Sequence, residues 1–172
     1  MQITLAYVIS LNGKITKGDD PDVKLWSSDE DWEHFVELRG KSDVVVMDRK
    51  TYETVKPPAE SGKLRVVFTS TPERFQGLEG QLEFVNETPA EFVKRMSESG
   101  YEKILLAGGA RLSGDFLAAG LVDDVYISYE PVLFGSGRPM IDEGGLDVKL
   151  RLQSVERLNE QGTILAHYKV LK

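Results

Sequence analysis

The chain has 172 residues, enough for one domain with a sizeable hydrophobic core that needs no disulfides or metals. Its net charge is −7 and its isoelectric point is about 5.0, which disfavours nucleic acid or an anionic membrane as the main partner. The lack of cysteine excludes disulfides, thiolate catalysis and cysteine-based metal sites, and the two histidines have no ligand-like spacing. We expect no metal, no membrane span, no signal peptide and a cytoplasmic location.

The apolar pattern predicts strands and helices that alternate over two thirds of the chain. Strands are expected at residues 2–9, 44–47, 64–68, 84–85, 104–107 and 122–130. Helices are expected from residues 28 to 40, in a short piece that stops before Pro57, from 88 to 100, and from about 112 to 120. The segments 148–152 and 164–170 then alternate on either side of a turn at 159–162. This order predicts a single α/β domain over 1–172, with a mainly parallel sheet and a C-terminal antiparallel hairpin.

Two helix starts carry capping signals. Thr88, followed by Pro89 and by Glu91, is typical of a capping box, and Ser28 with Asp31 three residues later predicts a second one. One face of the earlier helix is expected to carry Trp32, Phe35, Val36 and Arg39, and the inward face of the later helix is expected to carry Phe92, Val93 and Met96.

The apolar run at 104–107 is followed by Gly108-Gly109, directly before a helix. Without Cβ atoms, the two glycines let a ligand approach the backbone, and the following helix N-terminus favours phosphate. An ordinary tight turn is the alternative, since the spaced glycines of a dinucleotide fingerprint are missing.

Polar residues follow four of the predicted parallel strands, where ligands bind in an open sheet. These segments are 10–14, 48–51, 69–71 and 108–111; three of them carry hydroxyls and three carry a basic side chain. Their convergence favours an extended, phosphate-bearing nucleotide. Neither His34 nor His167 follows a strand end, so chemistry is expected to come from a bound cofactor, as in hydride transfer.

Several motifs together resemble the dihydrofolate-reductase-like superfamily over essentially the whole chain. The resemblance is closer to the pyrimidine reductase domain of riboflavin biosynthesis, the C-terminal domain of a bifunctional deaminase-reductase. The matching stretches are residues 10–15 (Ser-Leu-Asn-Gly-Lys-Ile), 26–28 (Trp-Ser-Ser), 49–52 (Arg-Lys-Thr-Tyr), Gly108-Gly109, 120–124 and 131–139.

This resemblance implies an NADPH-dependent reductase, usually a homodimer, that acts on a small pyrimidine or pterin. It implies cofactor contacts from Ala6, Ile15, Arg49, Lys50, Thr51, Thr69, Ser70, Gly108, Gly109, Ala110, Arg111 and Leu112. It implies substrate contacts from Ser10, Asn12 and Trp26, and it places Lys14 beside the substrate, where an ammonium could polarise a carbonyl or imine. Solvated positions for Lys14, Arg49 and Lys50, and core packing for Ala6 and Ile15, are the alternatives.

Three residues depart from the family pattern. Asp48 stands where glycine is usual, and as an N-cap it would occupy N–H groups that a phosphate would use and add like charge. Ala107 replaces a glutamate before the double glycine, so a substrate would lose a charged partner worth about 1.5–3 kcal/mol. Asn12 stands where aspartate is usual, so the substrate need not be the ribosylated diaminopyrimidine.

Asp31 has two interpretations. Counted from Trp26, it lies where dihydrofolate reductases hold the acid that binds the pterin ring, and a carboxylate that accepts two N–H donors suits that role. The capping box with Ser28 is the other interpretation. The leading hypothesis is therefore a 5-amino-6-(5-phosphoribosylamino)uracil reductase. The alternatives are a dihydrofolate or pterin reductase and a non-catalytic ligand-binding protein whose cofactor site is closed by Asp48.

Overall fold

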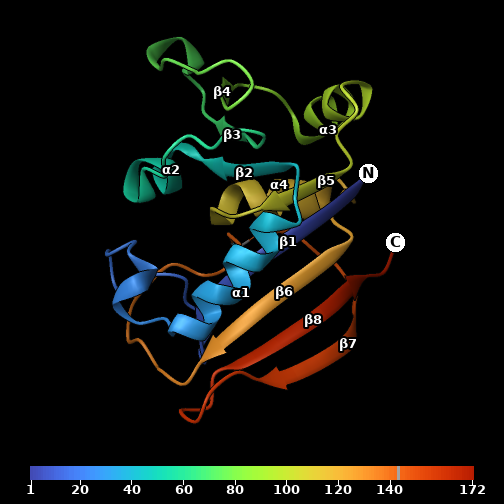
Figure 1. Cartoon of the computed structure of the whole chain (residues 1–172). Coiled ribbons are helices and arrows are strands. Elements are labelled where there is room, and N and C mark those ends of the chain that lie inside the picture. The colour runs from blue at the N-terminus through green and yellow to red at the C-terminus, as the bar shows by residue number, and fades with distance from the viewer. Residues whose placement is uncertain (143) are drawn as a thin grey trace.

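In the computed structural model, which describes residues 1–142 and 144–172, one sheet runs through the whole molecule (Figure 1). Its eight strands follow the order β4-β3-β2-β5-β1-β6-β8-β7. The strands are β1 (Gln2–Ser10), β2 (Val44–Asp48), β3 (Leu64–Phe68), β4 (Leu82–Val85), β5 (Lys103–Leu106), β6 (Asp124–Glu130), β7 (Leu150–Arg157) and β8 (Ile164–Val170). The helices are α1 (Asp29–Gly40), α2 (Arg49–Val55), α3 (Pro89–Glu98) and α4 (Ala110–Ala118), with 3₁₀ turns at Val23–Leu25 and Pro72–Arg74.

The predicted fold class is confirmed. The six strands β1 to β6 pair in parallel, whereas β8 runs antiparallel to β6 and to β7. The predicted elements are all present within a few residues of their expected bounds. The start of β6 differs by two residues, since pairing begins at Asp124 although the apolar pattern begins at Val122. Val122 is fully buried and packs in the core ahead of the strand, because burial and strand pairing need not start together.

Helices cover both faces of the sheet (Figure 1). On one face, Phe92 and Met96 of α3 and Phe116 of α4 pack on aliphatic side chains of the parallel strands and form the main core. On the other face, the smaller cluster Val45, Met47 and Val67 lies beside Tyr52 of α2. Helix α1 lies on this second face, over β6. The second face has the smaller core, which leaves room for a cavity.

Helix α1 does not bury the face that its sequence suggests. Trp32 and Val36 are 38% and 36% exposed, and the one buried side chain of the helix is Asp31. The face that the sequence predicts is therefore only partly buried, and Trp32, Phe35 and Arg39 of that face line a cavity. The reason is tertiary, since α1 lies over polar side chains of β6, Tyr126 and Ser128, instead of over an aliphatic layer.

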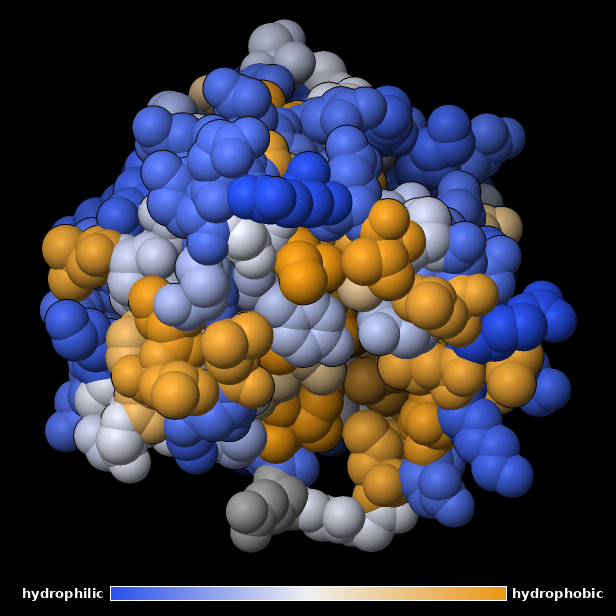
Figure 2. Space-filling model, turned by 90° about the horizontal axis from the view of Figure 1, so that it is seen from below, coloured by the Kyte–Doolittle hydropathy of each residue, from blue (hydrophilic) through white to orange (hydrophobic). Residues whose placement is uncertain are grey.

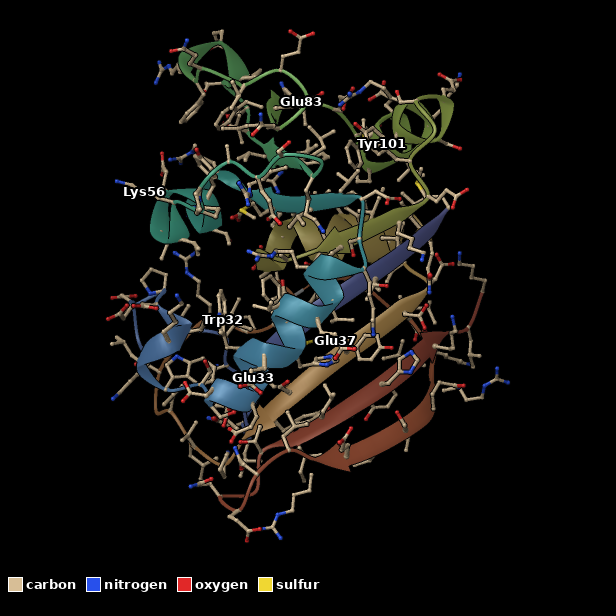
Figure 3. The ribbon with its side chains drawn as sticks, viewed as in Figure 1. Trp32, Glu33, Glu37, Lys56, Glu83 and Tyr101 are labelled. Carbon is tan, nitrogen blue, oxygen red and sulfur yellow. The ribbon has the colours of Figure 1, made fainter. Side chains whose placement is uncertain are left out.

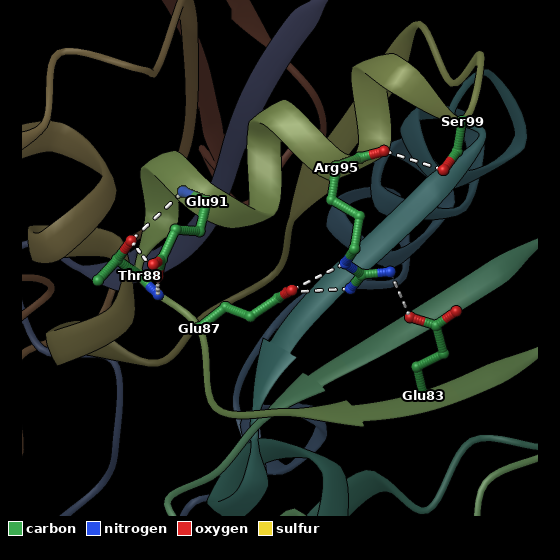
Figure 4. Close-up of polar contacts among 6 residues, drawn as sticks. All are labelled: Glu83, Glu87, Thr88, Glu91, Arg95 and Ser99. Atoms are coloured by element: carbon green, nitrogen blue, oxygen red, sulfur yellow. Dashed lines mark hydrogen bonds and ion pairs between the residues drawn. The ribbon is translucent and has the colours of Figure 1, made fainter.

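Helix α3 has the predicted capping box. The Thr88 hydroxyl accepts the Glu91 N–H at 3.3 Å, and the Glu91 carboxylate accepts the Thr88 N–H at 2.9 Å (Figure 4). Arg95 extends from the same helix to the carboxylates of Glu87 and Glu83, at 2.8 and 3.0 Å. These contacts lie at the β4 end of the sheet and fix α3 locally.

The C-terminal hairpin forms the other end of the sheet. Every residue of β7 is exposed, including Leu150, Leu152 and Val155 at 40%, 51% and 57%. Strand β7 ends the sheet order, so one of its edges has no neighbouring strand among the described residues. Figure 2 views the molecule from below Figure 1 and shows apolar surface, in orange, between hydrophilic areas on this side.

Candidate functional site

A cavity of about 510 Å³ opens where the parallel strands end. Its walls come from β1, β2, β3, β6, α1, α2 and the glycine turn before α4, so segments far apart in the chain meet there. Trp32 projects from α1 on the side of the molecule where α2 ends at Lys56 (Figure 3). The cavity thus lies where ligands bind in open α/β sheets.

The glycine turn requires glycine at both positions. Gly108 has a φ of +103°, in the region that side chains rarely adopt. A Cβ on Gly109 would lie 2.5 Å from the Asp48 Oδ2. Gly109 is also the N-cap of α4, and no side chain caps that helix. The first N–H groups of α4 therefore point without side-chain partners toward the cavity wall that Gly109, Ala110 and Arg111 form.

Asp48 caps α2, as the sequence predicts. Its Oδ1 accepts the Thr51 N–H at 2.8 Å, while its Oδ2 lies against Gly109. The carboxylate thus occupies the space between the N-termini of α2 and α4. A phosphate would meet an open helix N-terminus at α4, but at α2 it would meet a negative charge and an N–H already in use.

The other predicted cofactor residues surround this point. The cavity is lined by Ala6, Ile15, Arg49, Lys50, Thr51, Thr69, Ser70, Gly108, Gly109, Ala110 and Arg111. Arg49 pairs with Glu53 at 2.6 Å, which neutralises part of its charge. Leu112 is 6% exposed and its side chain packs in the core, so only its backbone N–H at the start of α4 remains for a ligand. Hydroxyls, cations and an open helix N-terminus fit a phosphate-bearing cofactor, whereas Asp48 and Asp142, which also line the cavity, oppose it.

Asp31 lines the cavity where α1 faces β6, a region called the inner part below, and it is 9% exposed. Burial raises the pKa of its carboxyl to about 6, with a smaller contribution in the same direction from the charge of Glu130 and an opposing one from a hydrogen bond with Ser128. Only one of the two hydrogen bonds of the expected capping box between Ser28 and Asp31 is present. The Ser28 hydroxyl accepts the Asp31 N–H at 3.3 Å, but the Ser28 N–H donates to Glu130 Oε1 at 2.8 Å and not to Asp31. The Asp31 carboxyl is thereby left for the cavity.

Two guanidinium groups line the cavity beyond Asp31. Arg65 is 4% exposed; its Nη1 donates to the Pro58 carbonyl at 2.9 Å, and its Nε has no partner among the described residues. Arg39 from α1 is close enough to lower the pKa of Arg65, although burial lowers it more. Neither arginine takes part in an ion pair in the part of the chain that the structure describes. Two unpaired cations in a cavity wall favour an anionic ligand group.

The predicted substrate residues of the first loop lie outside the cavity lining. Ser10 is fully buried and its hydroxyl donates to Asn12 at 2.8 Å and accepts the Lys14 N–H at 3.0 Å. Asn12 is held by the backbone of Phe134 at 2.7 Å, and Trp26 packs edge-on against the Phe134 ring. Lys14 forms an isolated β-bridge with Pro139. In this arrangement these four residues build the loop beside the cavity, and their substrate roles stay predictions.

Sequence reasoning missed Arg39, Arg65 and Ser128, which line the cavity, and Glu130, whose charge acts on Asp31 from outside the cavity lining. A signal existed for three of them: Arg65 interrupts an apolar strand, while Ser128 and Glu130 are polar residues on one face of a strand. Arg39 carried no such signal, because a basic residue in the last turn of a helix is ordinary.

Several classes of site find no support in the residues at 1–142 and 144–172. They contain no group of three or more histidine or acidic side chains that could hold a metal ion. Their helices include none long and apolar enough to cross a membrane. His167 stacks on Tyr126 and contacts Asp124 Oδ1 at 2.7 Å, whereas His34 lines the cavity with a pKa lowered by burial.

Known proteins are similar to this chain in sequence or in fold. The protein YwjB of Bacillus subtilis (strain 168) is 30% identical over 174 residues, which cover 96% of each chain. A diaminohydroxyphosphoribosylaminopyrimidine deaminase/5-amino-6-(5-phosphoribosylamino)uracil reductase from Thermotoga maritima superposes with a TM-score of 0.78 at 17% identity, over 99% of this chain and 56% of that one. A dihydrofolate reductase from Enterococcus faecalis, complexed with NADP(H), superposes with a TM-score of 0.68 at 18% identity, over 99% and 97% of the two chains. The fold is therefore that of dihydrofolate reductase, and because the model for the RibD C-terminal domain matches residues 1–164, the chain belongs to the RibD C-terminal domain family.

Proposed function

We propose that the protein is an NADPH-dependent reductase of the riboflavin-pathway type, acting on a phosphoribosylated aminopyrimidine. The observation that carries the proposal is the composition of one cavity. It joins an open helix N-terminus and hydroxyls, which suit a dinucleotide, to a buried acid and two unpaired arginines, which suit a polar ring with an anionic tail.

The cofactor would be held in the part of the cavity that the N-termini of α2 and α4 border. The α4 N-terminus and Thr51 would face its phosphates, and Thr69 and Ser70 its adenosine end, while Ala6 and Ile15 line the part of the cavity suited to an apolar ring face. When bound, NADPH supplies the hydride, which explains why the site needs neither a nucleophile nor a metal of its own.

The substrate would occupy the inner part. Asp31 accepts N–H groups of the ring, and its raised pKa lets a fraction of the molecules carry a proton beside the reacting ring near pH 6. Arg39 and Arg65 are suited to the phosphate of the ribosyl group, since guanidinium groups bind phosphate with charge-assisted hydrogen bonds. The ring and its tail would thus span the inner cavity from Asp31 to the two arginines.

Turnover of purified protein tests this proposal directly. NADPH oxidation is expected with the phosphoribosylated substrate, and Arg39→Met should raise its KM about tenfold or more because one charge-assisted contact is lost. The same variant should leave the KM for the dephosphorylated nucleoside almost unchanged. Equal KM values for both compounds in the unmodified protein would contradict the assignment of the two arginines.

A dihydrofolate or pterin reductase is the second candidate, and Asp31 is the observation that favours it. A buried carboxyl on a helix beside the cavity is suited to an amino-substituted pterin ring, and the arginines would then face a carboxylate tail. Turnover of dihydrofolate in place of the pyrimidine, in the same assay, would select this candidate. A non-catalytic ligand-binding role follows if neither compound is reduced and NADPH does not bind.

We also propose that two copies associate through β7. Its free edge and the exposed side chains of Leu150, Leu152 and Val155 are suited to the same strand of a second copy. Light scattering is expected to give the mass of a dimer, and Val155→Glu to give a monomer that keeps its fold. A wild-type monomer at micromolar concentration would refute the proposed interface.

A further inference from the structure

Glu130 is a buried carboxylate at the cavity end of β6 whose hydrogen-bond partners come from two distant segments, the start of α1 and the turn before β8. It is 3% exposed. Its Oε1 accepts the backbone N–H and the hydroxyl of Ser28, at 2.8 and 2.7 Å, and its Oε2 accepts the Thr163 hydroxyl at 2.8 Å. A buried acid with three hydrogen bonds is expensive to disturb, because each lost donor leaves charge without compensation. Glu130 therefore fixes the start of α1 against the end of β6.

The link from Glu130 to the cavity passes through the first turn of α1. Ser28, which Glu130 holds, accepts the N–H of Asp31, and Asp31 is the buried residue of that helix. Few apolar contacts hold α1, since Trp32 and Val36 remain partly exposed. The orientation of α1, and hence of the Asp31 carboxyl, depends to an unusual degree on this polar anchor.

The anchor also reaches the C-terminal hairpin. The Thr163 hydroxyl also accepts a hydrogen bond from the side-chain amide of Asn159. The same amide donates to Glu30 Oε2, in the first turn of α1, at 3.0 Å. The turn between β7 and β8 thus holds the first turn of α1 from the other side. None of these four anchor groups, Glu130, Ser28, Thr163 and Asn159, lines the cavity in the described part of the chain.

We propose that Glu130 is a positioning residue, which places the Asp31 carboxyl in the cavity by holding Ser28 and keeps it beside a second negative charge. The inference rests on the role proposed above for Asp31 in binding the substrate ring. The groups that act on Asp31 across the helix–sheet contact are Ser128 and Glu130 of β6, and of these only Glu130 carries charge. Removing the charge of Glu130 should therefore change the pH at which Asp31 titrates. Removing the Ser28 hydroxyl should instead change the position of the Asp31 carboxyl.

Two variants separate charge from position. In Glu130→Gln, the carboxyl of Asp31, followed by carbon NMR, is expected to titrate at a pH below its wild-type midpoint of about 6, toward the ordinary aspartate range. In Ser28→Ala, the midpoint should stay raised, while kcat/KM falls about fivefold because the first turn of α1 loses its cap. The affinity for NADPH should be unchanged in both, since the cofactor residues lie on other elements.

Thr88→Ala is the matched control, because it removes an N-cap from α3, outside the cavity. It should lower stability to a similar extent and leave the Asp31 titration and kcat/KM unchanged. A wild-type Asp31 midpoint in Glu130→Gln, or a wild-type kcat/KM in Ser28→Ala, would overturn the proposal. If Glu130→Gln does not fold, Thr163→Val removes one of the three hydrogen bonds and is judged by kcat/KM as Ser28→Ala is. Wild-type protein without any NADPH-dependent turnover would refute the proposed function, and the NMR titration would still decide whether Glu130 acts on Asp31.

Discussion

Replacing Asp48 with glycine is expected to tighten NADPH binding about 10- to 100-fold. The carboxylate lies between the N-termini of α2 and α4 and accepts the Thr51 N–H, so its removal frees a phosphate donor and removes a like charge. Loss of the cap should cost only a few tenths of a kcal/mol, because glycine is itself an acceptable N-cap. Isothermal titration of wild type and variant with NADPH measures the change.

Asp48→Asn provides the control for this result. Asparagine keeps an oxygen for the Thr51 N–H and removes only the charge, so it should recover part of the gain in affinity. If both variants bind NADPH as weakly as the wild type, or more weakly, the electrostatic account of Asp48 is wrong.

Asp31→Asn is expected to make the protein more stable and much less active. The kcat/KM for the substrate should fall about 100-fold, because a charge-assisted contact to the ring and a group that holds a proton near neutral pH are both lost. At the same time the variant removes a buried carboxyl that is ionised above pH 6 in a cavity wall. Comparison of steady-state kinetics with urea unfolding shows both effects on one protein.

The gain in stability should depend on pH in a defined direction. The pKa of Asp31 is raised from 3.8 to about 6 in the folded state, so the folded protein holds this proton more tightly than the unfolded chain does. Stability from this group is fully present below about pH 4 and is lost as the pH rises through 6. Roughly two pH units correspond to about 3 kcal/mol as an upper limit. Asp31→Asn should therefore exceed wild type by about 2 kcal/mol at pH 7.5 and differ little at pH 4. An equal difference at both pH values would contradict this origin.

The elements of the fold could be predicted because their signals are local. Strands β2, β3 and β5 contain short apolar runs, which only Arg65 interrupts in β3, and α3 carries its capping box and its inward apolar residues within ten positions. The carboxyl ends of these strands necessarily meet at one edge of a parallel sheet, so the position of the cavity also followed from the sequence. Local patterns and one topological rule were sufficient there.

The part of the site around Asp31 could be predicted only in part, because it depends on which face of α1 meets β6. The sequence left two interpretations of Asp31 open, an acid that binds the substrate ring and a capping-box partner of Ser28, and it could not decide between them. In the structure the Ser28 N–H goes to Glu130, more than 100 residues away, and Asp31 turns to the cavity. A hydrogen-bond partner that is so distant in the sequence leaves no signal in the local residue pattern. The same holds for Arg39 and Arg65, which approach each other only when α1 lies over the sheet.

Titration with NADPH tests the central claim most directly. Binding is followed by the quenching of Trp26 and Trp32 fluorescence through energy transfer to the cofactor, and Trp32 lines the cavity itself. Saturable binding in the micromolar range, tightened by Asp48→Gly, is the result that a working reductase site predicts. Absence of saturation up to millimolar NADPH, in the wild type and in Asp48→Gly alike, would contradict the assignment of this cavity to a dinucleotide-dependent reductase.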